Sequence, residues 1–197
     1  MSRIIFFDTE TTGILSRYPE AEIIEYTFQV WEDGVRGDFV TKKVKPGLPV
    51  PEEAARINGY TEEAWAGAQP WGVEDWENVR RFFPSCEANV KPKGIVVPGG
   101  HNVDFDIDML NNQIRRFHGL HLPLDLSYRK VDTCRMAIAL FELGEITSAS
   151  LVNVARYFGI DTSLAHSSAG DVEMTIQVWE QFLLVLDSGL RSMRGVV

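Results

Sequence analysis

The sequence predicts an α/β fold in which helices flank a mixed sheet. Three observations support this prediction. Residues 4–7 form a short, strongly apolar segment typical of a buried central strand, two alternating segments follow, and segments with apolar residues at helical spacing dominate the rest. Because consecutive elements pack beside one another in such chains, this order favours one sheet with helices on its faces. We expect residues 1–197 to form a single domain with its core at about residues 4–186.

The elements can be predicted along the whole chain. In order they are strands at residues 4–7, 22–31 and 38–45, helical segments at 51–58, from 61 and at 73–83, a strand at 94–98, a helix at 104–118, a strand ending near 131, and helices at 133–143, 150–158 and 170–186.

Turn and capping residues mark the boundaries in the first half. The Asp33-Gly34 pair separates two alternating segments, which predicts a hairpin and an antiparallel meander of the first three strands. Pro51 opens the first helical segment, and Asn58-Gly59 ends it.

The boundaries in the second half depend on proline and glycine. Pro84 ends the helix that starts near residue 73, and Pro98-Gly99 ends the next strand. Gly159 ends the helix that begins at Ser150. The last helix has an apolar stripe that we expect to pack on the sheet.

The composition excludes several classes of protein. At 45% hydrophobic and 11% aromatic residues, the chain can form a core and is unlike a disordered protein. A net charge of -9 argues against a protein that coats nucleic acid with a basic surface. Cys86 and Cys134 form no metal-binding pair and are typical of free thiols. With no signal peptide or membrane span expected, we predict a cytoplasmic protein with no membrane partner.

Two acids follow the first strand directly. Asp8 and Glu10 point to the same side if the strand continues through Thr9, because side chains alternate along a strand. Two such carboxylates repel each other and resist loss of solvent, and a divalent cation between them removes both problems. Oxygen ligands favour Mg²⁺ or Mn²⁺ over zinc. The alternative is a strand that ends in solvent with two hydrated acids.

Two further groups carry titratable residues. Asp104, Asp106 and Asp108 follow the strand that ends at residue 98, where ligands bind in open α/β sheets, but spacing alone does not select one of them. Asp104 could instead cap the next helix. His166 and Asp171 flank the start of the last helix, where Asp171 could be a metal ligand or a helix cap and His166 a general base or a structural residue.

Three segments resemble one enzyme family. FFDTETTG at residues 6–13, HNVDFD at 101–106 and HSSAGD at 166–171, in this order and at these separations, resemble the DEDD superfamily of 3'-5' exonucleases in its histidine-bearing (DEDDh) subclass. The chain is most similar to the branch that contains the proofreading epsilon subunits of bacterial DNA polymerase III and ribonuclease T. KPGLPVPEEAARINGYTEE, KVDTCRMA and SLVNVARYFGI also resemble family segments, so the likeness spans about residues 4–186.

The resemblance implies a fold and an activity. The fold is a ribonuclease H-like mixed sheet of five strands, three antiparallel and two parallel, flanked by helices. The activity is hydrolysis of phosphodiester bonds at the 3' end of single-stranded DNA with release of 5'-mononucleotides, assisted by two divalent cations, Mg²⁺ or Mn²⁺.

The resemblance also assigns residues by position. The metal-binding and catalytic acids are Asp8, Glu10, Asp106 and Asp171, and the general base is His166. The residues expected to bind substrate are Thr11, Thr12, Gly13, Asn58, Tyr60, Asn102 and Phe105.

Two departures from the family pattern bear on the substrate. The Asn58-Gly59-Tyr60 segment stands where the family often has His-Gly and an aliphatic residue, and Asp104 is an additional acid beside the site. The implied partners are 3' ends of single-stranded nucleic acid, DNA before RNA, and a DNA polymerase. The alternatives are an exoribonuclease on the same fold and a non-catalytic nucleic-acid-binding module of a replication assembly. The family's four acids and histidine are all present, which favours an enzyme.

Overall fold

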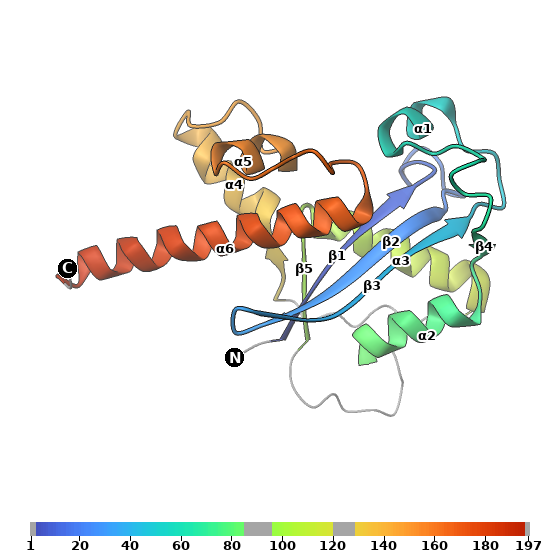
Figure 1. The fold of residues 1–197 in the computed structure, drawn as a ribbon, viewed down its shortest axis with the longest axis horizontal. Coiled ribbons are helices and arrows are strands. Elements are labelled where there is room, and N and C mark those ends of the chain that lie inside the picture. Colours follow the sequence, from blue (N-terminus) through green and yellow to red (C-terminus); the bar gives the residue numbers. More distant parts are fainter. Residues whose placement is uncertain (1–2, 85–95, 120–128, 196–197) are drawn as a thin grey trace.

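A single twisted sheet with helices on both faces organises the molecule (Figure 1). The computed structural model describes residues 3–84, 96–119 and 129–195. Its strands are β1 (Arg3–Thr11), β2 (Ile23–Glu32), β3 (Val35–Lys45), β4 (Gln69–Pro70), β5 (Val96–Gly100) and β6 (Val131–Asp132). Its helices are α1 (Glu52–Asn58), α2 (Val73–Phe82), α3 (Val103–His118), α4 (Thr133–Glu142), α5 (Leu151–Tyr157) and α6 (Ser168–Met193).

The strand order is β4-β3-β2-β1-β5-β6. The β1–β2 and β2–β3 pairs are antiparallel, whereas the β1–β5, β5–β6 and β3–β4 pairs are parallel. The mixed sheet flanked by helices is therefore confirmed. The predicted count of five strands is wrong by one, because β4 adds a two-residue strand beside the end of β3.

The helix predicted from residue 61 is also wrong. Residues 62–67 form turns, and their conformation is set by tertiary contacts. The Trp65 indole Nε1 donates a hydrogen bond to the Ile24 carbonyl at 2.8 Å, and the Tyr60 ring packs on the Trp65 ring at 5.1 Å. These contacts hold the segment against the sheet and lead it into β4, which overrides its helical pattern.

The side chains of β1 divide between the two faces of the sheet, as the strand period requires. Ile5 and Phe7 belong to a core beneath α2 and α3, whereas Ile4 and Phe6 belong to a core beneath α6. A third cluster packs α4 and α5 against α6. Asp8 and Glu10 therefore lie on the same face of the sheet as Ile4 and Phe6.

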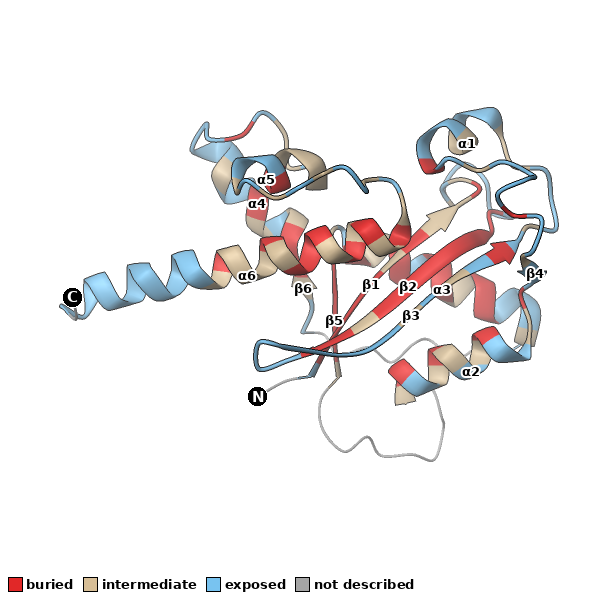
Figure 2. Cartoon of the chain, in the orientation of Figure 1, coloured by how far each residue is buried: buried red, intermediate tan, exposed pale blue. Residues whose placement is uncertain are grey.

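The last helix extends beyond the sheet. α6 is longer at both ends than the predicted 170–186, and its C-terminal half is exposed (Figure 2). Its buried residues end at Phe182, and Val172 and Ile176 pack in the core that includes Ile4 and Phe6 of β1, so the core holds the start of α6 in place. No helix in the described residues has the length and apolar character needed to cross a membrane. Cys134 is a free cysteine, and Cys86 lies outside the described residues.

Candidate active site

The carboxyl end of β1 forms the floor of the site. Asp8 and Glu10 lie on one face because β1 continues through Thr11. One carboxylate oxygen of each, together with one of Asp171, forms a group in which all atoms lie within 4.8 Å of one another. The predicted pairing of the two acids on one side is therefore present, and α6 adds a third.

The first turn of α6 delivers Asp171. The N-cap residue Ser167 accepts a hydrogen bond from the Gly170 backbone at 3.2 Å and donates one to the Leu164 carbonyl at 2.9 Å. A Cβ on Gly170 would lie 2.0 Å from the same carbonyl oxygen, so only glycine lets the preceding loop lie this close to the helix. Loop and helix start are thus one packed unit.

Asp106 comes from the first turn of α3. It is 3% exposed, and its Oδ1 accepts hydrogen bonds from the Thr9 amide at 2.9 Å and the Thr9 hydroxyl at 2.7 Å. Asp106 is thereby attached to the strand residue between Asp8 and Glu10. Both donors are neutral groups, and among the described residues no cation donates a hydrogen bond to this carboxylate.

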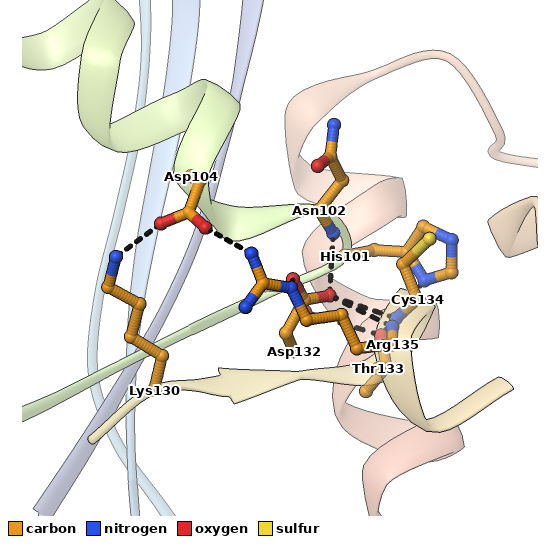
Figure 3. Close-up of polar contacts among 9 residues, drawn as sticks. His101, Asn102, Asp104, Lys130, Asp132, Thr133, Cys134 and Arg135 are labelled. Carbon is orange, nitrogen blue, oxygen red and sulfur yellow. Dashed lines mark hydrogen bonds and ion pairs between the residues drawn. The ribbon is translucent and has the colours of Figure 1, made fainter. Parts of the chain in front are cut away.

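The other two acids of the same segment are directed elsewhere. Asp104 forms ion pairs with Lys130 and with Arg135, the latter at 2.6 Å (Figure 3). Asp108 is exposed. The N-cap of α3 is Asn102, so Asp104 does not cap this helix. Burial and contacts thus distinguish Asp106 from its neighbours, which spacing could not do.

His166 lies at the edge of the site. Its backbone is in the left-handed region, with a φ of 69°, and its amide donates to Asp171 Oδ1 at 3.2 Å. The residue is exposed. A non-glycine residue in this conformation stores local strain, and such strain is common where a side chain is positioned for function. His166 therefore lies two residues before the start of α6, and its exposure places the imidazole on the solvent side of Asp171.

Burial and mutual repulsion act on all these acids. Burial, followed by the charges of Asp106 and Asp171, raises the pKa of Asp8 well above its usual value. The same causes, burial first and then Asp171 and Glu25, raise the pKa of Glu10 to about 8. Burial raises the pKa of Asp106 to about 7, although the Thr9 hydrogen bonds oppose the rise. Burial also raises the pKa of Asp171, against the His166 contact.

Glu25 is a fifth acid at the site, and sequence reasoning missed it. It lies directly opposite Glu10 in the β1–β2 pair and is 7% exposed. Its Oε1 accepts hydrogen bonds from the Ser168 amide at 3.0 Å and hydroxyl at 2.9 Å. Strand register is the feature of the sequence that could have indicated Glu25. A strand that starts near residue 22 and runs antiparallel to β1 can place an acid opposite Glu10.

A cavity of about 280 Å³ adjoins the acids. The predicted substrate-binding residues in its wall are Thr11, Thr12, Gly13, Asn58 and Phe105. Asn58 joins α1 to β1, because its Nδ2 donates to the Thr11 carbonyl at 3.0 Å. A Cβ on Gly13 would lie 2.7 Å from the Tyr18 ring, which also lines the cavity. Glu10 lines it too, so cavity and acids are continuous.

Two of the predicted substrate-binding residues lie outside this wall. The Tyr60 ring packs on the Trp65 ring. The backbone amide of Asn102 donates a hydrogen bond to Asp132 Oδ1 at 2.9 Å (Figure 3). Neither residue lines the cavity. Their contact with substrate stays a prediction.

The donor set fits divalent cations. Asp8, Glu10 and Asp171 converge, Asp106 and Glu25 lie beside them, and none of the five forms an ion pair with Lys or Arg within the described residues. Uncompensated buried carboxylates are unfavourable unless a cation is bound. Hard oxygen donors suit Mg²⁺ or Mn²⁺.

Comparison with known proteins agrees with this geometry. A family model described as an exonuclease, that of the RNase T family, matches residues 5–179. The epsilon subunit of DNA polymerase III from Treponema pallidum is 29% identical over 174 residues, which cover 88% of this chain and 73% of the relative. A PolC-type DNA polymerase III from Pediococcus pentosaceus is 27% identical over 181 residues, or 92% of this chain, but the match covers only 11% of that protein.

Solved structures share the fold. E. coli Exonuclease I in complex with a dT13 oligonucleotide superposes with a TM-score of 0.72 and 21% identity, covering 92% of this chain and 41% of that one. The cell-death related nuclease 4 has a TM-score of 0.71 and 11% identity, covering 94% of this chain and 64% of that one. The match of the family model over most of the sequence decides the assignment: this chain belongs to the RNase T family of exonucleases.

Proposed function

We propose that this domain is a metal-dependent 3'-5' exonuclease that removes 5'-mononucleotides from single-stranded DNA. One observation carries the proposal. Oxygens of Asp8, Glu10 and Asp171 lie within 4.8 Å of one another, beside a cavity of about 280 Å³. In the described structure, none of these three acids forms an ion pair with a Lys or Arg side chain. A site that gathers negative charge next to a cavity suits a phosphodiester held through divalent cations.

The carboxylates would hold two divalent cations, Mg²⁺ or Mn²⁺. Asp8, Glu10, Asp106 and Asp171 balance the charge of two such ions, which supports this count. When bound, the cations would polarise the phosphate and stabilise the charge that develops on the attacking and leaving oxygens. The protein's part is to present the four acids from three rigid elements, so that little reorganisation is needed.

His166 would act as the general base. It lies next to Asp171 on an exposed loop, from which an imidazole can accept the proton of the attacking water. The 3'-oxygen of the penultimate nucleotide leaves, and no covalent enzyme intermediate is needed. The contact of Asp171 with the His166 amide links the base to the metal-binding group.

The cavity would take the terminal nucleotide. Its wall combines the Thr11–Gly13 turn with the Phe105 ring and the apolar side of α1, and aromatic and apolar walls favour an unpaired base. Association with a DNA polymerase is part of the proposal, because relatives of this chain are named as subunits or parts of DNA polymerase III.

The test uses single-stranded DNA and RNA oligonucleotides of one sequence, labelled at the 5' end. We expect stepwise shortening from the 3' end with Mg²⁺ or Mn²⁺, faster for DNA, and none with chelator. His166→Ala should lower kcat by roughly 10²–10⁴-fold, the range for loss of a general base. His118→Ala is the control, because His118 contacts Trp71 at the far end of α3.

Two results would contradict the proposal. Folded protein that degrades neither polymer with either cation would favour a binding module instead. Faster cleavage of RNA than of DNA would make the domain an exoribonuclease with the same site.

A further inference from the structure

We propose that Glu25 is a positioning residue that attaches the His166–Asp171 segment to the sheet through Ser168. The inference rests on the proposed exonuclease function. It assigns a role to an acid that is absent from the three sequence motifs.

The contacts of Glu25 are directed at the start of α6. Its Oε1 receives both the amide and the hydroxyl of Ser168, at 3.0 and 2.9 Å. Ser168 is the first residue of the helix and is fully buried. One side chain on β2 therefore satisfies a helix-terminal amide that the helix cannot satisfy itself.

The Ser168 hydroxyl extends this attachment across the sheet. It lies 2.8 Å from the Thr27 hydroxyl, which lies 2.8 Å from the Thr41 hydroxyl. Hydroxyls from α6, β2 and β3 thus lie in a row beside the Glu25 carboxylate, with Ser168 donating to Glu25 and Thr27 donating to Thr41. Hydrogen bonds of buried groups restrict motion of the elements they join.

The attachment point lies between the two functional residues of the segment. Ser168 follows His166 by two residues and precedes Asp171 by three, and the His166 amide bonds to Asp171. Displacing the first turn of α6 would move the Asp171 carboxylate and the His166 loop together. In catalysis, positional errors of about 1 Å can lower the rate about 100-fold.

A second buried glutamate on the same segment provides a contrast. Glu22 is 2% exposed and accepts hydrogen bonds from the Gly47 and Leu48 amides at 2.6 and 3.3 Å. It also pairs with Arg116 at 3.0 Å. Glu25 has no such cationic partner in the described residues and faces the site acids. A buried carboxylate without a cationic partner is unfavourable, so an acid of this kind that faces the site acids points to a role at the site.

Glu25 is distinct from the proposed ligands, since its oxygens are not in the convergent group of Asp8, Glu10 and Asp171. Its Oε1 is already occupied by the two Ser168 donors. Its contribution is therefore the attachment of Ser168 to the sheet, rather than direct coordination.

The experiment compares Glu25→Gln, Ser168→Ala and the double variant with wild type. Glu22→Gln is the matched control, with the same substitution three residues away. Measurements are kcat and KM on the single-stranded oligonucleotide, the number of Mn²⁺ ions bound by calorimetry, the thermal midpoint, and hydrogen exchange of the amides at residues 166–171.

We expect each single variant to lower kcat by about 10-fold, the lower end of effects from residues that orient metal ligands. KM and the number of bound Mn²⁺ ions should stay unchanged, and the 166–171 amides should exchange faster. Because both residues act through one contact, the double variant should resemble the single variants rather than their product. Glu22→Gln should lower the thermal midpoint and leave both kcat and the exchange of these amides near wild type.

Three outcomes would overturn the inference. Loss of a Mn²⁺ ion in Glu25→Gln would make Glu25 a ligand. An unchanged kcat with only a lower thermal midpoint would make it structural. Multiplying effects in the double variant would show that Glu25 and Ser168 act separately. Because hydrogen exchange does not depend on turnover, an inactive wild type would refute the proposed function while the exchange data still tested the Glu25 attachment.

Discussion

Two buried acidic regions of this molecule are built in opposite ways. Asp75 on α2 is 1% exposed, and the Lys42 ammonium at 2.9 Å, the Tyr26 hydroxyl at 3.0 Å and the Gly72 amide at 2.8 Å satisfy it. Asp106, 3% exposed at the other region, receives hydrogen bonds from the amide and hydroxyl of Thr9 and from no Lys or Arg side chain of the described residues. The first acid is neutralised by the protein, and the second shares its surroundings with further acids.

The difference indicates what each region is for. A buried carboxylate with a cation and well-placed donors stabilises the fold and requires nothing from solution. A group of buried carboxylates without a cation is unfavourable by itself and becomes favourable when a cation binds. Ion pairing in the described structure thus separates Asp75, which is compensated within the protein, from Asp106, a metal ligand in the proposed function, although both are buried.

The largest expected effect comes from substituting one acid in each of the two regions. Asp8→Asn should lower activity by more than about 100-fold, because in the proposed function it removes a metal ligand rather than a group that orients one. In metal-free protein it should raise the free energy of unfolding at pH 8, since repulsion with Asp106 and Asp171 disappears. Asp75→Ala should lower it by about 1–3 kcal/mol, because Lys42 and Tyr26 lose a partner.

Urea unfolding in chelator and single-turnover assays measure these effects. Asp75→Ala serves as the activity control and should retain turnover below its unfolding transition. A destabilised Asp8→Asn protein in chelator would show that the two regions do not differ in this way.

A smaller effect concerns pH. The pKa of Glu10 rises from 4.5 unfolded to about 8 folded, so its contribution to stability is fully present below pH 4.5 and is lost as the pH rises through about 8. The free energy of unfolding in chelator should therefore fall over this interval. Mn²⁺ at 100 times its Kd should restore about 2.7 kcal/mol at pH 8.

Thermal unfolding from pH 5 to 8.5, with and without Mn²⁺, measures this dependence. Metal affinity should rise over the same interval, because the ligands must be deprotonated. Stability in chelator that increased with pH would mean that these acids are compensated in solution, as Asp75 is in the structure.

The smallest effect tests how Thr9 orients Asp106. Thr9→Val keeps the amide donor and removes the hydroxyl donor, which should raise the pKa of Asp106 above its value of about 7. We expect turnover at pH 7 to fall by about 10-fold and the acidic limb of the pH–rate profile to move to higher pH. A profile that keeps its position would assign the orientation of Asp106 to the backbone amide alone.

Most of the fold could be predicted because its elements are strongly patterned. The apolar run at β1, the apolar and aromatic residues of β2 and the stripe on α6 all lie within single elements. The errors fall where distant contacts decide. The Trp65 bond to Ile24 prevents a helix and leads into β4, which has only two residues and therefore no periodic signal.

The site divides in the same way. The proximity of Asp8 and Glu10 could be predicted because the strand period is a local property of the chain, and similarity to a family supplied the choice of Asp106, Asp171 and His166. The local sequence pattern did not indicate Glu25. Strand register and the packing of α6 bring its neighbours Glu10 and Ser168 to it.

The order of side chains along the polymer therefore specified the class of fold, the family and the acids that meet at the end of β1. Ion pairing and burial decided which acid of the second group joins them. Asp104 is neutralised by Lys130 and Arg135, whereas Asp106 is buried and accepts a hydrogen bond from Thr9. The physical reason is that a charge depends on the groups around it in space, and those groups can lie far apart along the chain, as do Ser168 and Glu25, 143 residues apart.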